Sequence, residues 1–165
     1  MRSIIFDLDL TLVDTTPLEQ ARHERNWQLA DSKIGECHLY DGIQEIFNVI
    51  AKHHIPAAIV STSPGTYVKN IVQHFNIPVT YIIGYHDAKP CKPAPQPMLA
   101  ALEKLGCKAE QAISFGDRVI DIQASNAANV ESVACFWGTK ERKELIASGY
   151  RHAIIHPREI LTLIR

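Results

Sequence analysis

The chain of 165 residues lacks long hydrophobic runs, closely spaced cysteine pairs and a net charge of either sign. No stretch approaches the roughly 18 consecutive apolar residues of a membrane-spanning helix. Only one Arg and a few apolar residues precede the first Asp, so we expect no secretory signal peptide. The formal net charge of −1 gives no overall attraction to nucleic acid or anionic lipid. Recognition of an acidic substrate must therefore come from local groups.

The cysteines are also uninformative as ligands, because none of the four forms a C-x-x-C pair or another zinc-type spacing. They are Cys37, Cys91, Cys107 and Cys135. We therefore expect reduced structural thiols and a cytoplasmic protein.

What the chain does have is the composition of one globular domain. Hydrophobic residues make up 46% and charged residues 21%, and a chain of this size buries roughly 70% of its unfolded surface. No repeat, linker or low-complexity segment divides it, so residues 1–165 are predicted as a single domain.

Short apolar runs alternate with helical patterns along the chain. Such alternation predicts βαβ units, and continuously apolar runs are typical of strands covered by helices on both faces. The predicted strands are Ser3–Phe6, Ala57–Val60, Val79–Ile83, Ala112–Phe115, Val130–Phe136 and, less clearly, His152–Ile155. The sequence therefore predicts an α/β fold with a mainly parallel sheet of five or six strands.

Hydrophobic residues at helical spacing predict two helices that pack on this sheet. One stripe is Ile43, Ile46, Phe47 and Ile50, and the other is Met98, Leu99, Leu102 and Leu105. Thr16-Pro17-Leu18-Glu19 has the form of a capping box, which predicts a further helix from there to about Ala30.

Polar residues follow the predicted strands, at the edge of an open α/β sheet where ligands bind. Asp7 and Asp9 come directly after the first strand and are one residue apart. Repulsion between neighbouring carboxylates is relieved by a raised pKa or by a cation, so this pair predicts a Mg²⁺ site or an acid and base pair. The later loops bring Ser61, Lys92, Asp117 and Asp121 to the same edge.

These residue types suit phosphoryl transfer, which depends mainly on positioning and charge stabilisation. Asp7 is predicted as the nucleophile and Asp9 as the general acid and base. The predicted Mg²⁺ ligands are the Asp7 carboxylate, a main-chain carbonyl at Asp9, and Asp117, with Asp121 orienting Lys92 or a metal-bound water. Lys92 and Ser61 are predicted to contact the phosphate, together with Thr11 and the N–H groups that begin at Thr62.

Each of these residues also has an ordinary structural interpretation. An isolated Asp-x-Asp forms turns or caps, Ser61 alone suits an ST-turn, and Lys92 alone suits an exposed loop. Gly116-Asp117 alone is a turn signal, and Asp121 alone a solvated helix residue. Their joint order along the chain favours the catalytic interpretation.

Four motifs then identify a family. They are Asp7-Leu8-Asp9-Leu10-Thr11, Ile59-Val60-Ser61, Lys92-Pro93-Ala94-Pro95 and Gly116-Asp117-Arg118-Val119-Ile120-Asp121. With them the chain resembles the haloacid dehalogenase-like (HAD) hydrolase superfamily, in its phosphoglycolate-phosphatase-like branch. The resemblance covers nearly the whole chain, including Trp137-Gly138. It implies a Rossmann-like three-layer α/β/α sandwich, Mg²⁺ dependence and hydrolysis of a phosphomonoester through an aspartyl-phosphate.

The sequence departs from the family pattern at two places without losing a catalytic group. Leu10 stands where the family usually has Gly, and residues 125–129 replace a stretch that usually contains glycines. Asn tolerates the left-handed conformation that we expect in that stretch. The presence of Asp9 disfavours the dehalogenase branch, which lacks this second aspartate.

A third departure is the cap, because residues 15–39 leave room for only a short insert where relatives have a helical cap domain. An open site favours a bulky substrate, closure by a second copy in a homodimer, or modest selectivity. On the insert, Arg22 and Arg25 are predicted to share a helix face, as are His23 and Trp27. The two arginines, with Arg118, are candidates for binding the distal part of a substrate. A solvated amphipathic helix with Trp27 packed on the core is the alternative.

The sequence thus predicts a Mg²⁺-dependent phosphatase that acts on a small phosphorylated substrate, without a role at a membrane. A phosphatase of a protein or nucleic-acid end is an alternative, although the near-neutral charge disfavours nucleic acid. A regulatory module that binds phosphate without catalysis is the alternative from another class.

Overall fold

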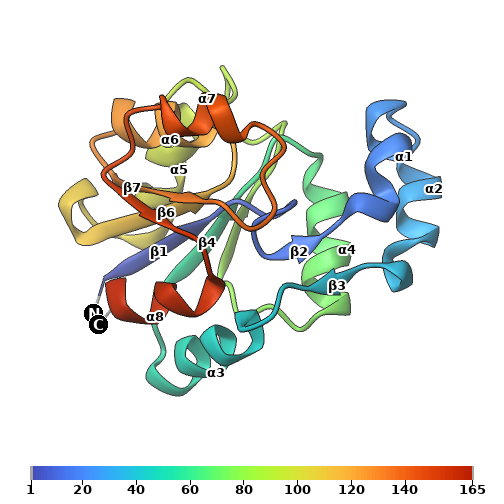
Figure 1. Cartoon of the computed structure of the whole chain (residues 1–165), viewed down its shortest axis with the longest axis horizontal. Coiled ribbons are helices and arrows are strands. Elements are labelled where there is room, and N and C mark those ends of the chain that lie inside the picture. The colour runs from blue at the N-terminus through green and yellow to red at the C-terminus, as the bar shows by residue number, and fades with distance from the viewer. Residues whose placement is uncertain (1, 165) are drawn as a thin grey trace.

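A computed structural model describes residues 2–164 and contains a parallel six-stranded sheet within that range (Figure 1). Its strands are β1 (Ser3–Phe6), β4 (Ala57–Val60), β5 (Tyr81–Ile83), β6 (Ala112–Gly116), β7 (Glu131–Cys135) and β8 (His152–Ile154). They lie in the order β5-β4-β1-β6-β7-β8, and every neighbouring pair is parallel. The prediction of a parallel sheet is confirmed, with shorter limits for the strands predicted to begin at Val79 and Val130.

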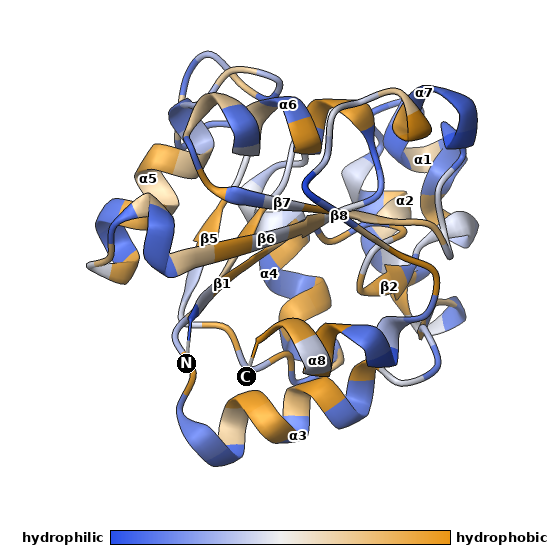
Figure 2. Ribbon diagram, turned by 60° about the vertical axis from the view of Figure 1, so that its left-hand side comes forward, coloured by the Kyte–Doolittle hydropathy of each residue, from blue (hydrophilic) through white to orange (hydrophobic). Residues whose placement is uncertain are grey.

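Helices cover both faces of the sheet and give the three layers of an α/β/α sandwich (Figure 2). α3 (Ile43–His53), α4 (Gly65–His74) and α8 (Ile160–Leu163) pack on one face. α5 (Gln96–Leu105) and α6 (Val119–Ala127) pack on the other, and α7 (Arg142–Ile146) lies beside α6.

The central strand shows why its sequence is continuously apolar. Ile4 and Phe6 of β1 belong to the core under α3 and α4, whereas Ile5 between them belongs to the core under α5 and α6. All three side chains are buried. Successive strand residues point to opposite faces, so a strand covered on both sides needs apolar residues at every position.

The helical stripes are confirmed except at one position. Ile43, Ile46, Phe47 and Ile50 are all buried in α3. In α5, Met98 and Leu102 are buried together with Ala101, but Leu99 is 48% exposed. The prediction for Leu99 was wrong because the buried face follows the spacing 98, 101, 102, and Leu99 lies to one side of it.

The segment after β1 forms the insert, which extends beyond the sheet at one end of the molecule (Figure 1). β2 (Val13–Asp14) and β3 (His38–Leu39) pair antiparallel at its base. Between them lie a 3₁₀ turn (Thr16–Leu18), α1 (Glu19–His23), α2 (Trp27–Ser32) and a second 3₁₀ turn (Ile34–Glu36).

The prediction of one continuous helix from Thr16 to Ala30 was wrong. Arg25 has a φ of 54°, in the left-handed region that ends α-helices, and the next residue starts a new helix. The Asn26 side chain accepts a hydrogen bond from the Leu29 N–H at 3.1 Å, as an N-cap does. Arg22 and Arg25 therefore share no helix face, and neither do His23 and Trp27. Trp27 packs against the core, as the alternative interpretation expected.

Among residues 2–164, no helix combines the length and hydrophobicity required to cross a membrane.

Candidate active site

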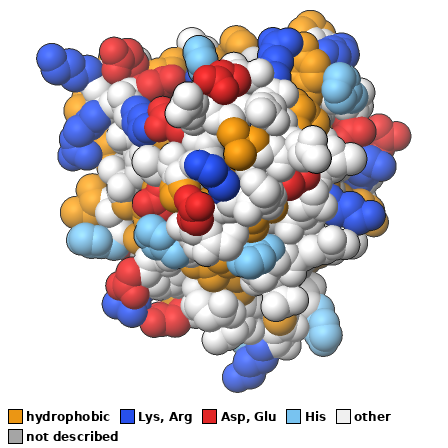
Figure 3. Space-filling model, turned by 90° about the vertical axis from the view of Figure 1, so that its right-hand side faces the viewer, with side chains coloured by type: hydrophobic (Ala, Val, Ile, Leu, Met, Phe, Trp, Pro, Cys, Tyr) orange, Lys and Arg blue, Asp and Glu red, His pale blue; other side chains and the backbone are white. Residues whose placement is uncertain are grey.

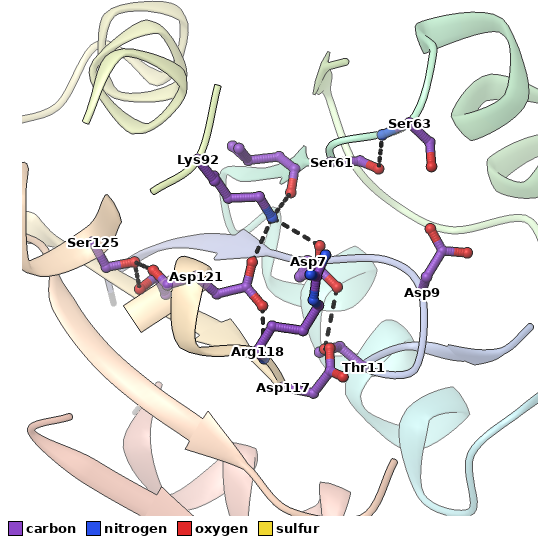
Figure 4. Close-up of polar contacts among 12 residues, drawn as sticks. Asp7, Asp9, Thr11, Ser61, Ser63, Lys92, Asp117, Arg118, Asp121 and Ser125 are labelled. Carbon is purple, nitrogen blue, oxygen red and sulfur yellow. Dashed lines mark hydrogen bonds and ion pairs between the residues drawn. The ribbon is translucent and has the colours of Figure 1, made fainter. Parts of the chain in front are cut away.

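The predicted site residues meet at the carboxyl edge of the sheet (Figure 4). Asp7 follows β1, Ser61 follows β4, and Asp117 follows β6. Lys92 comes from the loop after β5, and Asp121 from the first turn of α6. The chain order of strands and loops is therefore enough to bring these residues to one place.

Three carboxylates form the centre of the site. Oxygen atoms of Asp7, Asp117 and Asp121 all lie within 4.8 Å of one another. Burial, followed by the charges of Asp7 and Asp121, raises the pKa of Asp117 well above its ordinary value. The protein groups around the cluster therefore do not fully stabilise three ionised carboxylates.

Lys92 is the cation that forms hydrogen bonds to this cluster from its side chain within residues 2–164. Its Nζ donates hydrogen bonds to Asp7 Oδ1 at 2.9 Å, to Asp121 Oδ1 at 2.5 Å and to the Val60 carbonyl at 2.9 Å. Burial lowers the pKa of Lys92, but the charges of Asp121 and Asp7 outweigh it and raise that pKa overall. The Lys92 side chain is only 3% exposed, so its ammonium stabilises the cluster and is not a flexible surface charge.

A single bonded lysine does not neutralise three clustered carboxylates, and the pKa of Asp117 stays raised with that lysine in place. This observation fits a divalent cation. Mg²⁺ prefers oxygen ligands and is commonly bound through one or two carboxylates together with water. Asp7 and Asp117 supply such oxygens, and Asp117 is not bonded to Lys92. The donor set therefore fits the predicted Mg²⁺.

Asp121 has a double role that its sequence position only partly revealed. Its Oδ1 accepts from Lys92, and its Oδ2 accepts from the Arg118 N–H at 2.9 Å, which caps the start of α6. It is 6% exposed, so the alternative of a solvated helix residue is wrong. A Cβ at Gly116 would lie 2.4 Å from the Asp121 Cβ, so this close packing requires glycine.

Thr11 lies against two carboxylates of the cluster. Its Oγ1 donates to Asp117 Oδ1 at 2.9 Å and lies 3.5 Å from Asp7 Oδ2. Because Thr11 is completely buried, the prediction that it contacts the substrate does not hold. Its hydroxyl instead fixes the two carboxylates relative to each other.

Asp9 lies apart from the three clustered carboxylates (Figure 4). Its Oδ1 accepts hydrogen bonds from Thr15 Oγ1 and Tyr67 OH, both at 2.7 Å, and lies 3.3 Å from the Arg22 guanidinium. The Asp9 carboxylate is therefore not a member of the cluster, and only its main chain remains available for the predicted metal site. Its Oδ2 has no hydrogen-bond partner among the described residues.

The loop after β4 has the local geometry of an ST-turn. Ser61 Oγ accepts from the Ser63 N–H at 3.0 Å, and α4 begins at Gly65. The structural alternative for Ser61 is thus present, and the same turn directs the start of α4 toward the site. Thr62 and Ser63 line the cleft described next.

A cleft of about 420 Å³ opens above the carboxyl edge, between the insert and the loops of the core. The predicted substrate residues Arg22, Arg25, Thr62 and Arg118 all line it. Arg118 pairs with Glu141 at 3.2 Å, and Lys140 pairs with Glu19 of the insert. Figure 3, which faces the end of the molecule that carries the insert, shows basic and acidic side chains intermixed there.

Comparison with known proteins now assigns the family, since a family model described as "Haloacid dehalogenase-like hydrolase" matches residues 18–135, well over half of the chain. The chain belongs to this hydrolase family. The sequence prediction of a HAD-like hydrolase is confirmed.

Similar HAD proteins differ in how much of their length this chain covers. Pyrophosphatase PpaX of Oceanobacillus iheyensis is 27% identical, and the match covers 99% of this chain and 97% of that protein. Phosphoglycolate phosphatase of Colwellia psychrerythraea is 31% identical over 62% of this chain but only 46% of its own length. The structure of a hydrolase from Pseudomonas syringae superimposes with a TM-score of 0.83 at 17% identity, covering 98% of this chain and 97% of that one.

The alignment with the pyrophosphatase also bears on the insert. It extends over 215 positions, 50 more than the 165 residues of this chain. This HAD hydrolase is therefore shorter than that relative, which agrees with a reduced cap.

The two departures from the HAD pattern have a visible structural basis. Leu10 has a φ of 64°, and Asn129 one of 58°, so both adopt the left-handed conformation in which glycine is usual. Gly138 packs on the same loop, because a Cβ there would lie 2.2 Å from the Leu10 carbonyl oxygen. Beside it, Trp137 Nε1 donates to the Thr11 carbonyl at 2.9 Å. Residues 137 and 138 thus hold the loop that carries Asp7 and Asp9.

Sequence reasoning missed two residues that contact Asp9. Thr15 follows Asp9 by six residues and was assigned only to the start of the insert. Tyr67 comes from α4, 58 residues away, and no local pattern distinguishes it from a core tyrosine.

Proposed function

We propose that this HAD hydrolase is a Mg²⁺-dependent phosphatase that hydrolyses a small phosphomonoester through an aspartyl-phosphate at Asp7. The observation that carries the proposal is the group of Asp7, Asp117 and Asp121 at the sheet edge, with Lys92 bonded to Asp7. The names of the similar pyrophosphatase and phosphoglycolate phosphatase support phosphate-ester or anhydride chemistry.

In the first step, a carboxylate oxygen of Asp7 forms a bond to phosphorus while the bond from phosphorus to the leaving oxygen breaks. Asp9 gives its proton to that leaving oxygen, so the product alcohol departs neutral. Lys92 stays bonded to Asp7 and offsets the negative charge that nucleophile and phosphate bring together.

In the second step, Asp9 removes a proton from a water molecule whose oxygen attacks phosphorus. The bond between Asp7 and phosphorus breaks, inorganic phosphate leaves, and the Asp7 carboxylate is restored. Asp9 is protonated again, ready for the next substrate. Its position apart from the cluster suits a group that exchanges a proton without binding the metal through its side chain.

The Asp7 and Asp117 carboxylates, with the main-chain carbonyl at Asp9, would hold Mg²⁺. When bound, the ion would supply positive charge that offsets the repulsion between Asp7 and the phosphate. Asp121, bonded to Lys92 and to the start of α6, keeps Lys92 in place.

For substrate recognition we retain Ser61, Thr62, Arg25 and Arg118 as the contacts. Three of them line the cleft, and Ser61 adjoins it in the same turn. Closure of the cleft by a second copy and a cytoplasmic location stay predictions of the sequence. The four cysteines are unpaired, which supports a reducing compartment.

The decisive experiment is phosphate release from p-nitrophenyl phosphate with and without Mg²⁺, comparing wild type with Asp7→Asn. We expect Mg²⁺-dependent turnover that Asp7→Asn abolishes. Asp41→Asn is the matched control, because the Asp41 side chain is 89% exposed and outside the cleft. Turnover that survives Asp7→Asn, or no turnover of this ester and a panel of metabolite phosphates, would overturn the proposal in favour of a binding role.

A further inference from the structure

The Asp9 carboxylate is held through one of its two oxygens. Thr15 from the base of the insert, Tyr67 from α4 and Arg22 from α1 all approach Oδ1, at 2.7, 2.7 and 3.3 Å. Three separate segments thus converge on a single atom of the proposed acid and base.

We propose that Tyr67 and Arg22 are positioning residues for Asp9, which they hold by Oδ1 so that Oδ2 faces the leaving group. The inference rests on the proposed phosphatase function and deepens it. Neither residue needs to touch the substrate in this role, because both act through the orientation of one carboxylate.

The direction of the hydrogen bonds supports this assignment. Tyr67 OH and Thr15 Oγ1 both donate to Oδ1, so Oδ2 is the oxygen of Asp9 that these contacts leave free. That oxygen is the one without a partner among the described residues. Proton transfer to a leaving group requires an oxygen within hydrogen-bond reach and free of other donors.

Burial makes the arrangement difficult to replace. Tyr67 is 1% exposed and Thr15 is completely buried. Rotation of the Asp9 carboxylate away from them would leave two buried hydroxyl groups without an acceptor, and unpaired buried donors are costly. The observed rotamer is therefore strongly favoured.

The insert also packs against the helix that carries Tyr67. The Trp27 ring of α2 lies 5.3 Å from the Tyr67 ring, centroid to centroid. Asn70 of α4 donates to Asp31 of α2 at 2.9 Å. The short insert is thus attached to the helix that carries Tyr67, and it also supplies Arg22. Its role in the reaction is to orient Asp9.

The test uses two esters of nearly the same shape, p-nitrophenyl phosphate and phenyl phosphate. Phenolate is the stronger base and depends more on protonation as it leaves. We expect Tyr67→Phe to lower kcat/KM for phenyl phosphate, which reports the step in which the leaving group departs, about tenfold or more through loss of the hydrogen bond to Asp9. The value of kcat/KM for p-nitrophenyl phosphate should change much less. Because both esters form the same aspartyl-phosphate, any effect on the second step lowers kcat for both esters equally. Tyr81→Phe is the control, because Tyr81 lies at the opposite end of the strands.

Arg22 is tested in the same way by Arg22→Gln, with Arg22→Lys as the conservative variant and Lys33→Gln as a charge-matched control on the insert. We expect Arg22→Gln to lower kcat/KM selectively for phenyl phosphate and Arg22→Lys to restore part of it. An equal fall in kcat/KM for both esters would overturn the inference, because it would make Arg22 a substrate contact. Asp9→Asn sets the upper limit, because it removes the proposed acid itself and should give the largest selective loss in kcat/KM for phenyl phosphate.

The outcomes separate this inference from the proposed function. If wild type hydrolyses both esters with Mg²⁺ but Tyr67→Phe and Arg22→Gln lower kcat/KM for both esters equally, or for neither, the inference alone is wrong. If wild type hydrolyses neither ester nor the metabolite panel, the proposed function is overturned and the inference with it. Thermal melting of each variant checks that it is folded, and Arg22→Gln tests the idea independently if Tyr67→Phe does not fold.

Discussion

The carboxylate cluster leads to an unusual prediction: removal of one of its charges should stabilise the metal-free protein. The perturbation is Asp117→Asn, which keeps the side-chain shape and leaves an oxygen to accept the Thr11 hydrogen bond. Asp117 faces Asp7 and Asp121, with oxygen atoms within 4.8 Å, whereas Lys92 bonds to the other two carboxylates.

The magnitude follows from Coulomb's law. At 4.8 Å and an effective dielectric constant of about 20, one pair of like charges costs about 3.5 kcal/mol. Attraction to Lys92 offsets part of the repulsion from two such pairs. A net gain of about 2 kcal/mol corresponds to a rise in Tm of about 4–8 °C for a chain of this size.

Mg²⁺ should reverse which of the two proteins, wild type or Asp117→Asn, has the higher Tm. In wild type, the ion at about 100 times its Kd stabilises the fold by about 2.7 kcal/mol, or about 5–11 °C in Tm. Asp117→Asn should lose most of this increase because it lacks a ligand. The variant is therefore more stable without Mg²⁺ and gains much less when the ion is added.

The pH dependence has a defined sign. The pKa of Asp117 is raised in the folded state, chiefly by burial and then by Asp7 and Asp121. A raised carboxyl pKa means that metal-free wild type loses stability as pH rises through that folded-state value. The variant should lose less, so the difference between the two proteins increases with pH.

The assay is thermal melting with EDTA or with excess Mg²⁺ at several pH values, with Asp41→Asn as the exposed control of equal charge change. A lower Tm for Asp117→Asn than for the control in EDTA would refute the electrostatic reasoning. A full Mg²⁺ shift in the variant would refute the assignment of Asp117 as a ligand.

Two further predictions concern residues that hold the site together. Thr11→Val keeps the side-chain shape but removes the 2.9 Å hydrogen bond to Asp117. It should therefore lower the free energy of unfolding, measured by urea titration, by about 1.5–3 kcal/mol. An unchanged urea midpoint would contradict a stabilising role for this hydrogen bond. Gly138→Ala places a Cβ 2.2 Å from the Leu10 carbonyl oxygen and should lower Tm and kcat together, since the loop carrying Asp7 and Asp9 must move. Gly35→Ala, where nothing lies within 4 Å of an added Cβ, is its control, and equal melting of these two variants would count against the packing argument.

Much of the fold was predictable because its signals are local. The apolar run at Ser3–Phe6 and the stripe of Ile43, Ile46, Phe47 and Ile50 each follow from the burial of one element. The main site was predictable for a related reason: parallel strands place Asp7, Lys92 and Asp117 at one edge from chain order alone. No side-chain detail was needed for that conclusion.

The insert was predicted less well because its structure depends on contacts outside it. A capping box with Pro at the first helical position favoured one helix, but Arg25 adopts a left-handed conformation and Asn26 begins a second helix. The second of these helices, α2, packs on α4, with Trp27 against Tyr67. Such tertiary contacts override local propensity, and the partners of Asp9 were missed for the same reason.

The charges around the cleft indicate how selective the site is. Arg22 contacts Asp9, Arg118 pairs with Glu141, and Lys140 pairs with Glu19, so most of the basic groups that line the cleft already have partners within the chain. Under the proposed function, Lys92, a bound Mg²⁺ and the N–H groups after Ser61 would be the main contacts of the phosphate, and they are the same for every phosphomonoester. The leaving group faces a cleft of about 420 Å³ bounded by a short insert. The phosphate thus has strong contacts, whereas the rest of the substrate has few. We therefore expect modest selectivity among small substrates.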